Sequence, residues 1–528
     1  MKALPIGVST FESIITSDAL YVDKTEILYQ FIKGKHPKRY FFSRPRRFGK
    51  SLTCSTLNAI FSGRKDLFTH LFIGKSDYEW QPRPVIVFDF SQISHKTPTA
   101  LMQGLHHALH TNAQKYGITL QEQELKEKFT ELIKILGTTH GPVAVIVDEY
   151  DKPITDLIEN LEQAEMARTE LKDFYGTLKG TDVDANMHFL FITGVSKFSK
   201  VALFSDLNNL EDLTNDKRAA SLVGYTDAEV DRYLTEHIQA LATTRTEQYG
   251  DTRRTLKAWY NGYRFTAQNS TVYNPFSLHN CLNQQSLYSY WFASGTPHFL
   301  VKFIEKNPLI ASDIESIEGS FFSEVHLDSF SIDLYYQNYR TLLLQTGYLT
   351  FASDYNPDKR GYIVAYPNEE VRYSMTEQIM QYVGGITPEQ FGEFGDRFRK
   401  ALLADDIGLF CKHLQNFIKL IPHTIRVDLE KFYHQVFFMI CVLFGKRPAA
   451  EVATEEGFMD LLLEGETCTF VIEFKKNSTP EIGLAQIEKK RYWEPYEIIK
   501  NKKIVLVGIT FNKTTAGTEV LWKSKELS

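Results

Sequence analysis

The segment from Ser43 to Ser51 has the composition of a phosphate-binding loop. It follows the short apolar run 39–42 and precedes a helix-compatible run from Leu52 to Phe61. In such a loop, backbone N–H groups and the helix N-terminus hold the phosphates, the lysine reaches the β and γ oxygens, and the serine hydroxyl joins Mg²⁺. Lys50 and Ser51 stand at those positions, but Arg44 replaces the first glycine of the usual pattern. A helix N-terminus with a solvated lysine would give the same short motif.

A second set of polar residues follows an apolar run further along the chain. Residues 143–147 are uninterruptedly apolar and end in Asp148 and Glu149. An ATPase needs both acids, one to hold Mg²⁺ through its ligands and one to polarise the attacking water. A strand that simply ends in solvated carboxylates is the alternative, but the Gly-Lys-Ser loop upstream favours the catalytic interpretation. Thr193 ends another apolar run, where a polar residue could sense the γ-phosphate.

These segments together predict a site for ATP and Mg²⁺. Glu149 is the predicted catalytic residue, and Ser51 and Asp148 are the predicted metal ligands. The residues expected around the nucleotide are Arg46, Arg47, Phe48, Gly49, Lys50, Ser51, Leu52, Asp148 and Thr193.

Two further carboxylates lie in a predicted hairpin near the C-terminus. The β-rich runs 458–463 and 469–474 flank residues 465–468, which suit a four-residue turn. A hairpin centred on Glu466 and Thr467 places Asp460 opposite Glu473. Directly opposed side chains project from one face with Cβ atoms about 5 Å apart. Both carboxylates are therefore predicted to converge and to bind a hard cation such as Mg²⁺.

Lys475 and Gln486 extend this predicted metal site. Lys475 lies two residues beyond Glu473 and therefore on the same face of the strand, where its ammonium could orient a water nucleophile or offset charge on a phosphorane. Gln486, on the following helix, could add a polar contact. The alternative is a surface hairpin with salt-bridged charges, although carboxylates within apolar strands are costly unless they bind something. The predicted catalytic residues are Asp460, Glu473, Lys475 and Gln486, with Asp460 and Glu473 as metal ligands.

Basic and aromatic residues follow the hairpin. Six basic residues outnumber two acidic ones between positions 489 and 503, with Tyr492, Trp493 and Tyr496 interleaved. Such a segment can hold a phosphate backbone. It is equally typical of a solvated face with aromatic anchors.

Alternating elements must position the first site. Short β-rich runs at 39–42, 85–90, 143–147 and 189–192 alternate with amphipathic stretches such as 101–116 and 122–136. This alternation predicts a parallel α/β sheet buried on both faces. The pattern is helical from 225 to 300, mixed from 301 to 400, and helical again from 428 to 444, before the C-terminal strands.

Composition excludes several classes of protein. The 528 residues are 43% hydrophobic and 23% charged, which excludes disordered and collagen-like chains. The net charge of -6 means that any nucleic-acid contact must use a local basic patch. The five cysteines are widely spaced, which argues against a disulfide framework or a zinc knuckle. The sequence shows no secretory pattern, and its longest apolar run is far shorter than the about 18 residues needed to span a bilayer. We therefore expect a cytoplasmic protein without membrane contact.

Four motifs together resemble a known family. Residues 21–25 (YVDKT), 44–51 (RPRRFGKS), 148–153 (DEYDKP) and 193–198 (TGVSKF) look like those of the bacterial AAA-ATPase-like family, whose members commonly end in a PD-(D/E)XK nuclease domain. The C-terminal Gly457, Asp460, Glu473, Lys475 and Gln486 resemble that nuclease signature. In this family the phosphate loop reads RPRRFGKS, so Arg44 is the family's form. The leading helix of such nucleases often supplies a further polar residue, and either Glu430 or His434 could do so here.

The resemblance implies an α/β architecture in four parts. We expect an N-terminal P-loop NTPase (AAA/ASCE-like) parallel sheet over 1–220, a helical lid over 221–300, a mixed linker region over 301–420 and an α/β restriction-endonuclease-like domain over 421–528. It also implies an ATPase coupled to a Mg²⁺-dependent nuclease in genome defence or mobile-element biology. The expected partner is nucleic acid, with DNA expected rather than RNA. The sequence leaves open whether the protein forms a homo-oligomer.

Two other functions are compatible with the sequence. The first is a nucleotide-switched binding or signalling module with a catalytically inactive nuclease-like domain. The presence of Asp460, Glu473 and Lys475 together argues against it, since a degenerate site is expected to lose at least one of them. The second is a motor ATPase that remodels DNA or protein, which needs an arginine finger that the sequence does not locate.

Overall fold

The computed structural model describes most of the chain as two compact units. The first comprises residues 1–295 and 319–371, and the second contains residues 372–528. The described residues are 1–34, 36, 38–158, 160–195, 197, 203–204, 207, 209–267, 270–295, 318–324, 339–384, 387–421, 430–443, 446, 448–454, 457–496, 502–515 and 517–527. Much of the predicted mixed region 301–400 lies outside these ranges, and the domain boundaries expected from the sequence stay predictions.

The first unit is built on a five-stranded parallel sheet. Its strands are β1 (Lys38–Ser43), β2 (Val85–Asp89), β3 (Val143–Asp148), β4 (Met187–Gly194) and β5 (Glu211–Asp212), in the spatial order β5-β1-β4-β3-β2. β4 is thus inserted between the strand that leads into the phosphate loop and the strand that ends in Asp148. Because all strands run in parallel, their carboxyl ends meet at one edge of the sheet.

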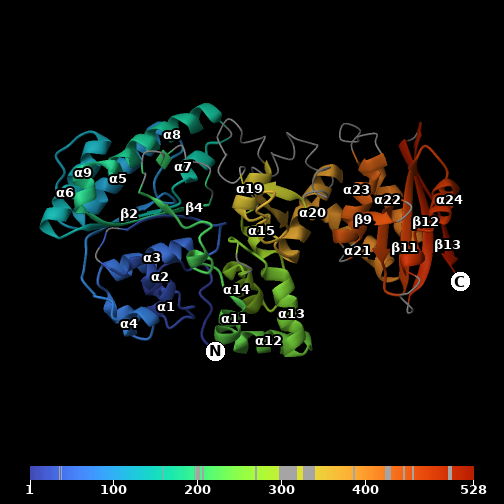
Figure 1. Ribbon diagram of the computed structural model, residues 1–528, viewed down its shortest axis with the longest axis horizontal. Coiled ribbons are helices and arrows are strands. Elements are labelled where there is room, and N and C mark those ends of the chain that lie inside the picture. The colour runs from blue at the N-terminus through green and yellow to red at the C-terminus, as the bar shows by residue number, and fades with distance from the viewer. Residues whose placement is uncertain are drawn as a thin grey trace. The chain divides into compact units, whose positions relative to one another are not determined.

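Helices cover both faces of this sheet (Figure 1). One face carries α1 (Phe11–Thr16), α2 (Thr25–Ile32), α3 (Lys50–Phe61) and α4 (Phe72–Lys75), and the other carries α5 (Pro98–Gln114), α6 (Leu125–Thr139), α7 (Lys152–Thr155), α8 (Leu161–Gly176) and α9 (Thr181–Asn186). Every residue of β3 and β4 is buried. The α/β class predicted from the alternating pattern is confirmed.

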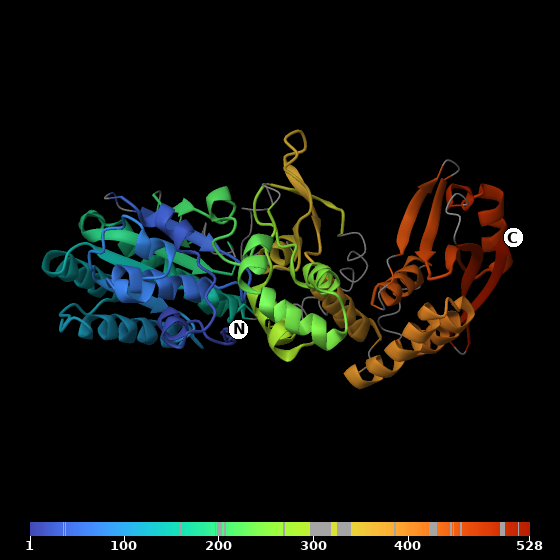
Figure 2. The same cartoon turned by 90° about the horizontal axis from the view of Figure 1, so that it is seen from below.

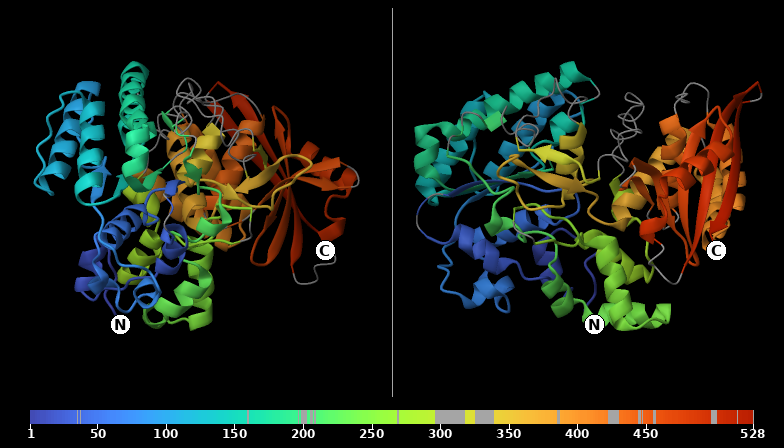
Figure 3. Two further views of the ribbon diagram at one scale, coloured as in Figure 1. Left: turned by 60° about the vertical axis from the view of Figure 1, so that its left-hand side comes forward. Right: turned by 45° about the vertical axis from the view of Figure 1, so that its right-hand side comes forward.

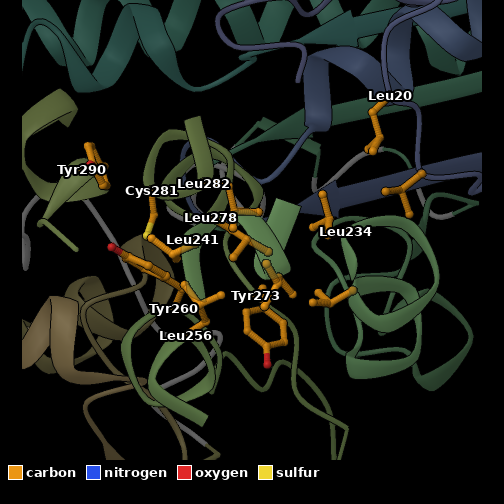
Figure 4. Packing of buried hydrophobic residues seen from close by; sticks show 13 residues of the cluster. Leu20, Leu234, Leu241, Leu256, Tyr260, Tyr273, Leu278, Cys281, Leu282 and Tyr290 are labelled. Atoms are coloured by element: carbon orange, nitrogen blue, oxygen red, sulfur yellow. The ribbon is translucent and has the colours of Figure 1, made fainter. Parts of the chain in front are cut away.

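A helical bundle follows, with a core of its own. Its helices are α11 (Asp227–Tyr233), α12 (Thr235–Arg245), α13 (Tyr249–Tyr260), α14 (Pro275–Gln284) and α15 (Tyr290–Gly295). Figure 4 shows the core, in which leucines from α12, α13 and α14 pack with Tyr260, Tyr273 and Cys281. Leu20 of the N-terminal segment joins the same cluster. The bundle is therefore packed on the N-terminal segment rather than attached by a loop alone.

Lys24 adds a buried ion pair to this contact. Its Nζ lies 2.6 Å from Glu229 Oε1. The other oxygen of Glu229 accepts the Thr226 N–H at 2.8 Å and so closes the capping box at the start of α11.

Short strands and one helix complete the first unit. The strands are β6 (Phe321–Ser323), β7 (Thr350–Phe351) and β8 (Gly361–Ala365), and the helix is α19 (Tyr339–Thr346). β8 pairs antiparallel with both other strands. Figure 2 shows the β7–β8 hairpin in gold.

The second unit is a mixed five-stranded sheet with helices. The order is β13 (Gly517–Leu527), β12 (Lys503–Thr514), β11 (Cys468–Lys476), β10 (Gly457–Glu464) and β9 (Ala449–Thr454), and only the β11–β12 pair is parallel. Figure 3 shows these strands in red, fanned by their twist. The helices are α20 (Glu369–Gly384, whose first residues belong to the first unit), α21 (Pro388–Leu403), α22 (Ile407–Leu420), α23 (Glu430–Leu443) and α24 (Pro480–Lys490).

Helices pack on both faces of this second sheet (Figure 1). Leu484 and Ile487 of α24 pack with Val471 of β11. Phe474 lies three positions after Val471 on β11, and its ring contacts that of Phe437 of α23 with centroids 5.3 Å apart. Since alternate residues of a strand face opposite sides, Glu473 lies on the α24 side.

Two findings bear on the environment of the chain. Among the described helices, none has the length and apolar character needed to cross a membrane. The five cysteines are free thiols, and four of them are buried.

The contact of α24 with the sheet requires a glycine at position 508. A Cβ atom there would lie 2.1 Å from the Pro480 carbonyl oxygen, at the first turn of α24. We expect Gly508→Ala to push α24 off the sheet and to destabilise the second unit by about 1–3 kcal/mol. Hydrogen exchange of peptides from β11 and α24 in the full chain measures this.

Gly392→Ala is the matched control. Gly392 lies inside α21 with no atom within 4 Å of its added Cβ, so alanine there should stabilise the unit by about 0.5–1 kcal/mol. Unchanged exchange of α24 in Gly508→Ala would contradict the close contact.

Candidate functional site

The phosphate-loop segment connects β1 directly to α3. Gly49 caps α3 with a φ of 105°, in the left-handed region, and Arg47 has a φ of 69°. A side chain at Gly49 would be strained by this backbone rather than by its neighbours, because nothing lies within 4 Å of its added Cβ. The glycine thus permits the sharp entry into the helix.

Lys50 is buried at the first position of α3. Its Nζ donates to the carbonyl oxygens of Arg44, at 2.9 Å, and Pro45, at 3.0 Å. Burial lowers the pKa of Lys50, against the opposing charges of Asp148, Asp151 and Glu149. The ammonium therefore lies inside the curl of the loop, close to the acids at the end of β3.

Arg44, which replaces the usual glycine, points into the core. Its guanidinium lies between the rings of Phe42 and Phe265, 4.5 and 4.3 Å from their centroids. It donates to the Thr214 carbonyl at 2.6 Å and to the Ala219 carbonyl at 3.2 Å. Burial lowers the pKa of Arg44 to about 9. The side chain therefore anchors the loop to residues 214–219, and the departure from the usual pattern has a structural reason.

Asp148 and Glu149 occupy the carboxyl end of β3. Asp148 is buried, and burial raises its pKa to about 6, against a hydrogen bond from Ser51 and the charge of Lys50. Glu149 has a φ of 54°, and its N–H donates to Asp148 Oδ1 at 3.0 Å. The turn after β3 thus separates the two acids, leaving Asp148 inside and Glu149 half-exposed.

Thr193 ends the neighbouring strand β4. Its carbonyl accepts the Tyr150 N–H at 3.1 Å, which joins the ends of β3 and β4. Its buried Oγ1 has no hydrogen-bond partner in the part of the chain that the structure describes. A hydroxyl in that state is costly to bury unless a ligand or water bonds to it.

Asp89 was missed by the sequence reasoning. It ends β2 and pairs in register with Asp148, and its charge is one of the causes that raise the pKa of Asp148. The signal was the one that revealed Asp148, an acid directly after a run of apolar residues.

The remaining predicted nucleotide residues divide into two groups. Ser51 lies beside Asp148, and Leu52 follows it in α3. Arg47 lies over the ring of Phe276, 5.0 Å from its centroid, and Phe48 is buried against Tyr263 with centroids 4.7 Å apart. The side chains of Arg47 and Phe48 therefore contact the helical bundle and its adjoining loop.

The C-terminal hairpin has the predicted register. β10 pairs Leu461 with Ile472 and Glu464 with Thr469, as a turn centred on Glu466 and Thr467 requires. The backbone pairing of β10 with β11 does not include Asp460. Instead, the side-chain Oδ2 of Asp460 accepts the Phe474 N–H at 2.8 Å. Asp460 is thereby fixed beside Glu473, and its charge acts on that residue.

Glu473 is the centre of this second site, with a relative exposure of 1%. Its Oε1 accepts hydrogen bonds from Lys475 Nζ, at 2.8 Å, and from Gln486 Nε2. Its Oε2 has no hydrogen-bond partner among the described residues. Burial and the charge of Asp460 raise the pKa of Glu473 to about 7, against the hydrogen bond and charge of Lys475. The four predicted residues are thus brought together.

The leading helix α23 offers the two alternatives considered for a fifth residue. The ring of His434 packs on Phe474, with centroids 4.7 Å apart. Burial lowers the pKa of Lys475, but its bond to Glu473 and the charges of Glu473, Asp460 and Glu430 outweigh burial and raise it. Glu430 therefore acts on the site electrostatically from α23. Within the described ranges, no three His, Cys, Asp or Glu side chains cluster to hold a metal.

Comparison with known proteins decides the family. A family model described as "Predicted AAA-ATPase" matches residues 5–204, and that of the "PD-(D/E)XK nuclease superfamily" matches residues 428–519. An "Uncharacterized protein in vnfD 5'region" of Azotobacter chroococcum mcd 1 is 33% identical in an alignment that covers 97% of each chain. The chain belongs to the AAA-ATPase-like family.

One solved structure is also similar to this AAA-ATPase-like protein. The Orc1 protein of Aeropyrum pernix in complex with DNA aligns over 67% of this chain and 90% of its own, with 11% identity and a TM-score of 0.25.

Protonation of Glu473 should control metal binding in this AAA-ATPase-like protein. A carboxyl must lose its proton to ligate a cation, and the pKa of Glu473 is raised to about 7. We therefore expect Mn²⁺ or Mg²⁺ affinity without nucleotide to fall about tenfold per pH unit below 7 and to level off above 8. Calorimetric titration at pH 6, 7 and 8 measures this.

Two variants control this titration. Subtracting the Asp460→Ala signal isolates the site, and Glu481→Gln, an exposed acid of α24, should retain the parent profile. A flat profile for the parent protein would contradict the protonation of Glu473.

Proposed function

We propose that this protein is an ATP-binding and ATP-hydrolysing enzyme coupled to a Mg²⁺-dependent nuclease that cleaves nucleic acid, DNA before RNA. The observation that carries the proposal is the buried carboxylate of Glu473. One of its oxygens is held by Lys475 and Gln486, and the other lacks a partner within the described chain. A buried carboxylate oxygen without a donor is costly, and a hard cation is the ligand that best satisfies it.

The first site fits a nucleotide with its magnesium ion. The Lys50 ammonium donates to two loop carbonyl oxygens. Phosphate oxygens would replace both acceptors without loss of a hydrogen bond, and their negative charge would attract the ammonium. Ser51 and Asp148 would hold Mg²⁺, and the bare hydroxyl of Thr193 would face the terminal phosphate. Bound Mg²⁺ would neutralise charge that develops on the phosphates. Glu149 lies half-exposed at the turn, where it can accept a proton from a water molecule.

The second site fits a cation and a phosphodiester. Two carboxylates suit Mg²⁺, which usually keeps several waters and completes its coordination with substrate oxygens. Bound Mg²⁺ would lower the pKa of a coordinated water and stabilise charge on the scissile phosphate. Lys475 would provide a positive charge beside that phosphate, and Gln486 would fix the orientation of Glu473.

The charges of α24 support nucleic acid as the partner. Glu481 and Glu488 lie on one flank of the helix and pair with Lys523 and Lys525 of β13. Lys489 follows Gln486 by three residues and is therefore its neighbour on the helix surface. Lys489 is exposed and makes no ion pair in the described part of the chain. Lys489 therefore leaves an uncompensated positive charge near Gln486, which suits a phosphate backbone.

The second candidate is a nucleotide-switched module with an inactive nuclease-like domain. The complete set Asp460, Glu473, Lys475 and Gln486 argues against it, because an unused buried Glu473 would only destabilise the sheet. A role in genome defence or mobile-element biology is part of the proposal as the family resemblance implies it. A cytoplasmic location, expected from the sequence composition, and a homo-oligomer are also part of it.

The nucleotide site can be tested with two substitutions. Lys50→Ala should abolish binding of Mg²⁺-ATP, because a neutral side chain leaves the phosphate charge uncompensated. Glu149→Gln should retain binding and reduce hydrolysis by at least about 10²-fold, the usual contribution of a general base. Calorimetry and phosphate release measure the two effects. Hydrolysis at the parent rate by Glu149→Gln would rule out the role of Glu149.

The nuclease site is tested with plasmid DNA and RNA, with and without Mg²⁺ and ATP. Asp460→Ala and Lys475→Ala should each remove cleavage and leave ATP binding intact, because they lie in the second unit. Glu481→Gln, on the opposite flank of α24, should cleave like the parent protein. Cleavage that survives Asp460→Ala would locate the activity elsewhere, and no cleavage of either nucleic acid by the parent protein would favour the inactive module.

A further inference from the structure

Residues distant in sequence pack against the phosphate-loop segment. The indole Nε1 of Trp291, at the start of α15, donates to the carbonyl oxygen of Arg46 at 3.1 Å. Gly347 lies so close to Pro45 that an added Cβ would be 2.7 Å from the proline ring. The N–H of Gly224 donates to the Phe48 carbonyl at 3.1 Å. The conformation of the loop therefore depends on the helical bundle and on the segment after α19.

Glu370 holds the start of α15 in place. This residue lies in the first turn of α20 and has a relative exposure of 0%. Its Oε1 accepts the backbone N–H of Trp291 at 2.7 Å and the hydroxyl of Ser277 at 3.0 Å. Its Oε2 has no hydrogen-bond partner among the described residues. One buried carboxyl oxygen thus joins α14, α15 and α20 immediately behind the indole that contacts the loop.

We propose that Glu370 and Trp291 form a brace that positions the phosphate loop for nucleotide. The proposal rests on the proposed nucleotide site. Glu370 is a positioning residue, because it acts on the loop through Trp291. The Trp291 indole donates one hydrogen bond to the Arg46 carbonyl. This bond orients the peptide group after Arg46, and therefore the N–H groups that follow it in the loop.

The surroundings of Glu370 favour its neutral form. Burial raises the pKa of Glu370 to about 8, against the two hydrogen bonds to its Oε1. The titratable groups that it affects are Tyr260, Tyr263, Cys281 and Tyr290, and burial raises the pKa of each of them as well. Arg245, which acts on Tyr260 and Cys281, is paired with Glu247.

Tyr260, Cys281 and Tyr290 belong to the bundle core drawn in Figure 4. As the pH rises through about 8, Glu370 would lose its proton. Its negative charge would then lie among uncharged tyrosine hydroxyls and a cysteine thiol. The guanidinium of Arg245 already has Glu247 as its acid partner. The brace should loosen as Glu370 ionises, and nucleotide affinity should fall.

The experiment measures Mg²⁺-ATP binding and steady-state hydrolysis by the full chain between pH 6.5 and 9. Trp291→Phe removes the indole donor and should weaken ATP binding about three- to tenfold, as expected for one hydrogen bond. It should raise KM and leave kcat unchanged. Parent affinity should fall by a similar factor as pH rises through 8. Glu370→Gln cannot ionise and should bind like the parent protein at pH 7 without the fall above pH 8.

Glu377→Gln is the matched control. Glu377 lies on the same helix, its pKa is also raised by burial, and it contacts neither Trp291 nor Ser277. This variant should keep the parent pH profile. A fall above pH 8 that persists in Glu370→Gln, or parent affinity in Trp291→Phe, would overturn the brace.

Hydrogen exchange without nucleotide separates this proposal from the function on which it rests. After correction for intrinsic rates, peptides covering residues 44–50 should exchange faster in Trp291→Phe, and faster above pH 8 in the parent protein but not in Glu370→Gln. Unchanged exchange would refute the brace even if ATP binds. If the exchange changes occur but Lys50→Ala leaves ATP binding unaffected, the brace stands and the proposed nucleotide site is wrong.

Discussion

The burial of carboxyl groups constrains this structure more than any other interaction. Asp148 and Glu473 end or occupy central strands, and Glu370 begins a helix, yet all three lie in the interior. Burial raises the pKa of each. A charge in such a place is costly unless donors or cations surround it. Each acid therefore determines what must lie around it, and the neighbouring loops and helices supply those groups.

The three acids resolve this cost in different ways. Asp148 lies beside Ser51 and Lys50, which are positioned by the start of α3. Glu473 receives Lys475 from its own strand and Gln486 from α24, and the helix can approach closely because Gly483 and Gly508 lie in the contact. Glu370 has two donors but no cation. The first two environments resemble sites that await a metal, whereas the third resembles a joint between helices.

The features that could be predicted from the sequence depend on residue patterns within short segments of the chain. The hairpin that brings Asp460 beside Glu473 followed from the period of two along β10 and β11 and from the length of the turn. The acids after β3 were visible because five apolar residues precede them. Strands β9 and β13 were not predicted: they lie at the edges of the sheet, and most of β13 is exposed. An edge strand buries too little to need an apolar pattern.

Long-range contacts account for what the sequence did not reveal. Arg44 takes the place of a glycine in the phosphate loop, and its partners Thr214 and Ala219 lie far along the chain. Glu370 follows another glutamate in an ordinary helix start, so nothing local distinguishes it as buried. Trp291 contacts a loop that precedes it by more than two hundred positions. Such pairings depend on how elements pack, and no periodicity in one segment encodes them.

The backbone at Glu149 has a consequence for how this site can change. Its φ of 54° places a glutamate in the left-handed region, which asparagine adopts far more readily. Replacement by asparagine would relieve strain of about 1 kcal/mol and would also remove the carboxylate. A lineage under selection for thermal stability alone would therefore drift toward a more stable protein without the acid. If Glu149 has its proposed role, retention of glutamate trades stability for activity, and its loss in a homologue would mark a chain released from hydrolysis.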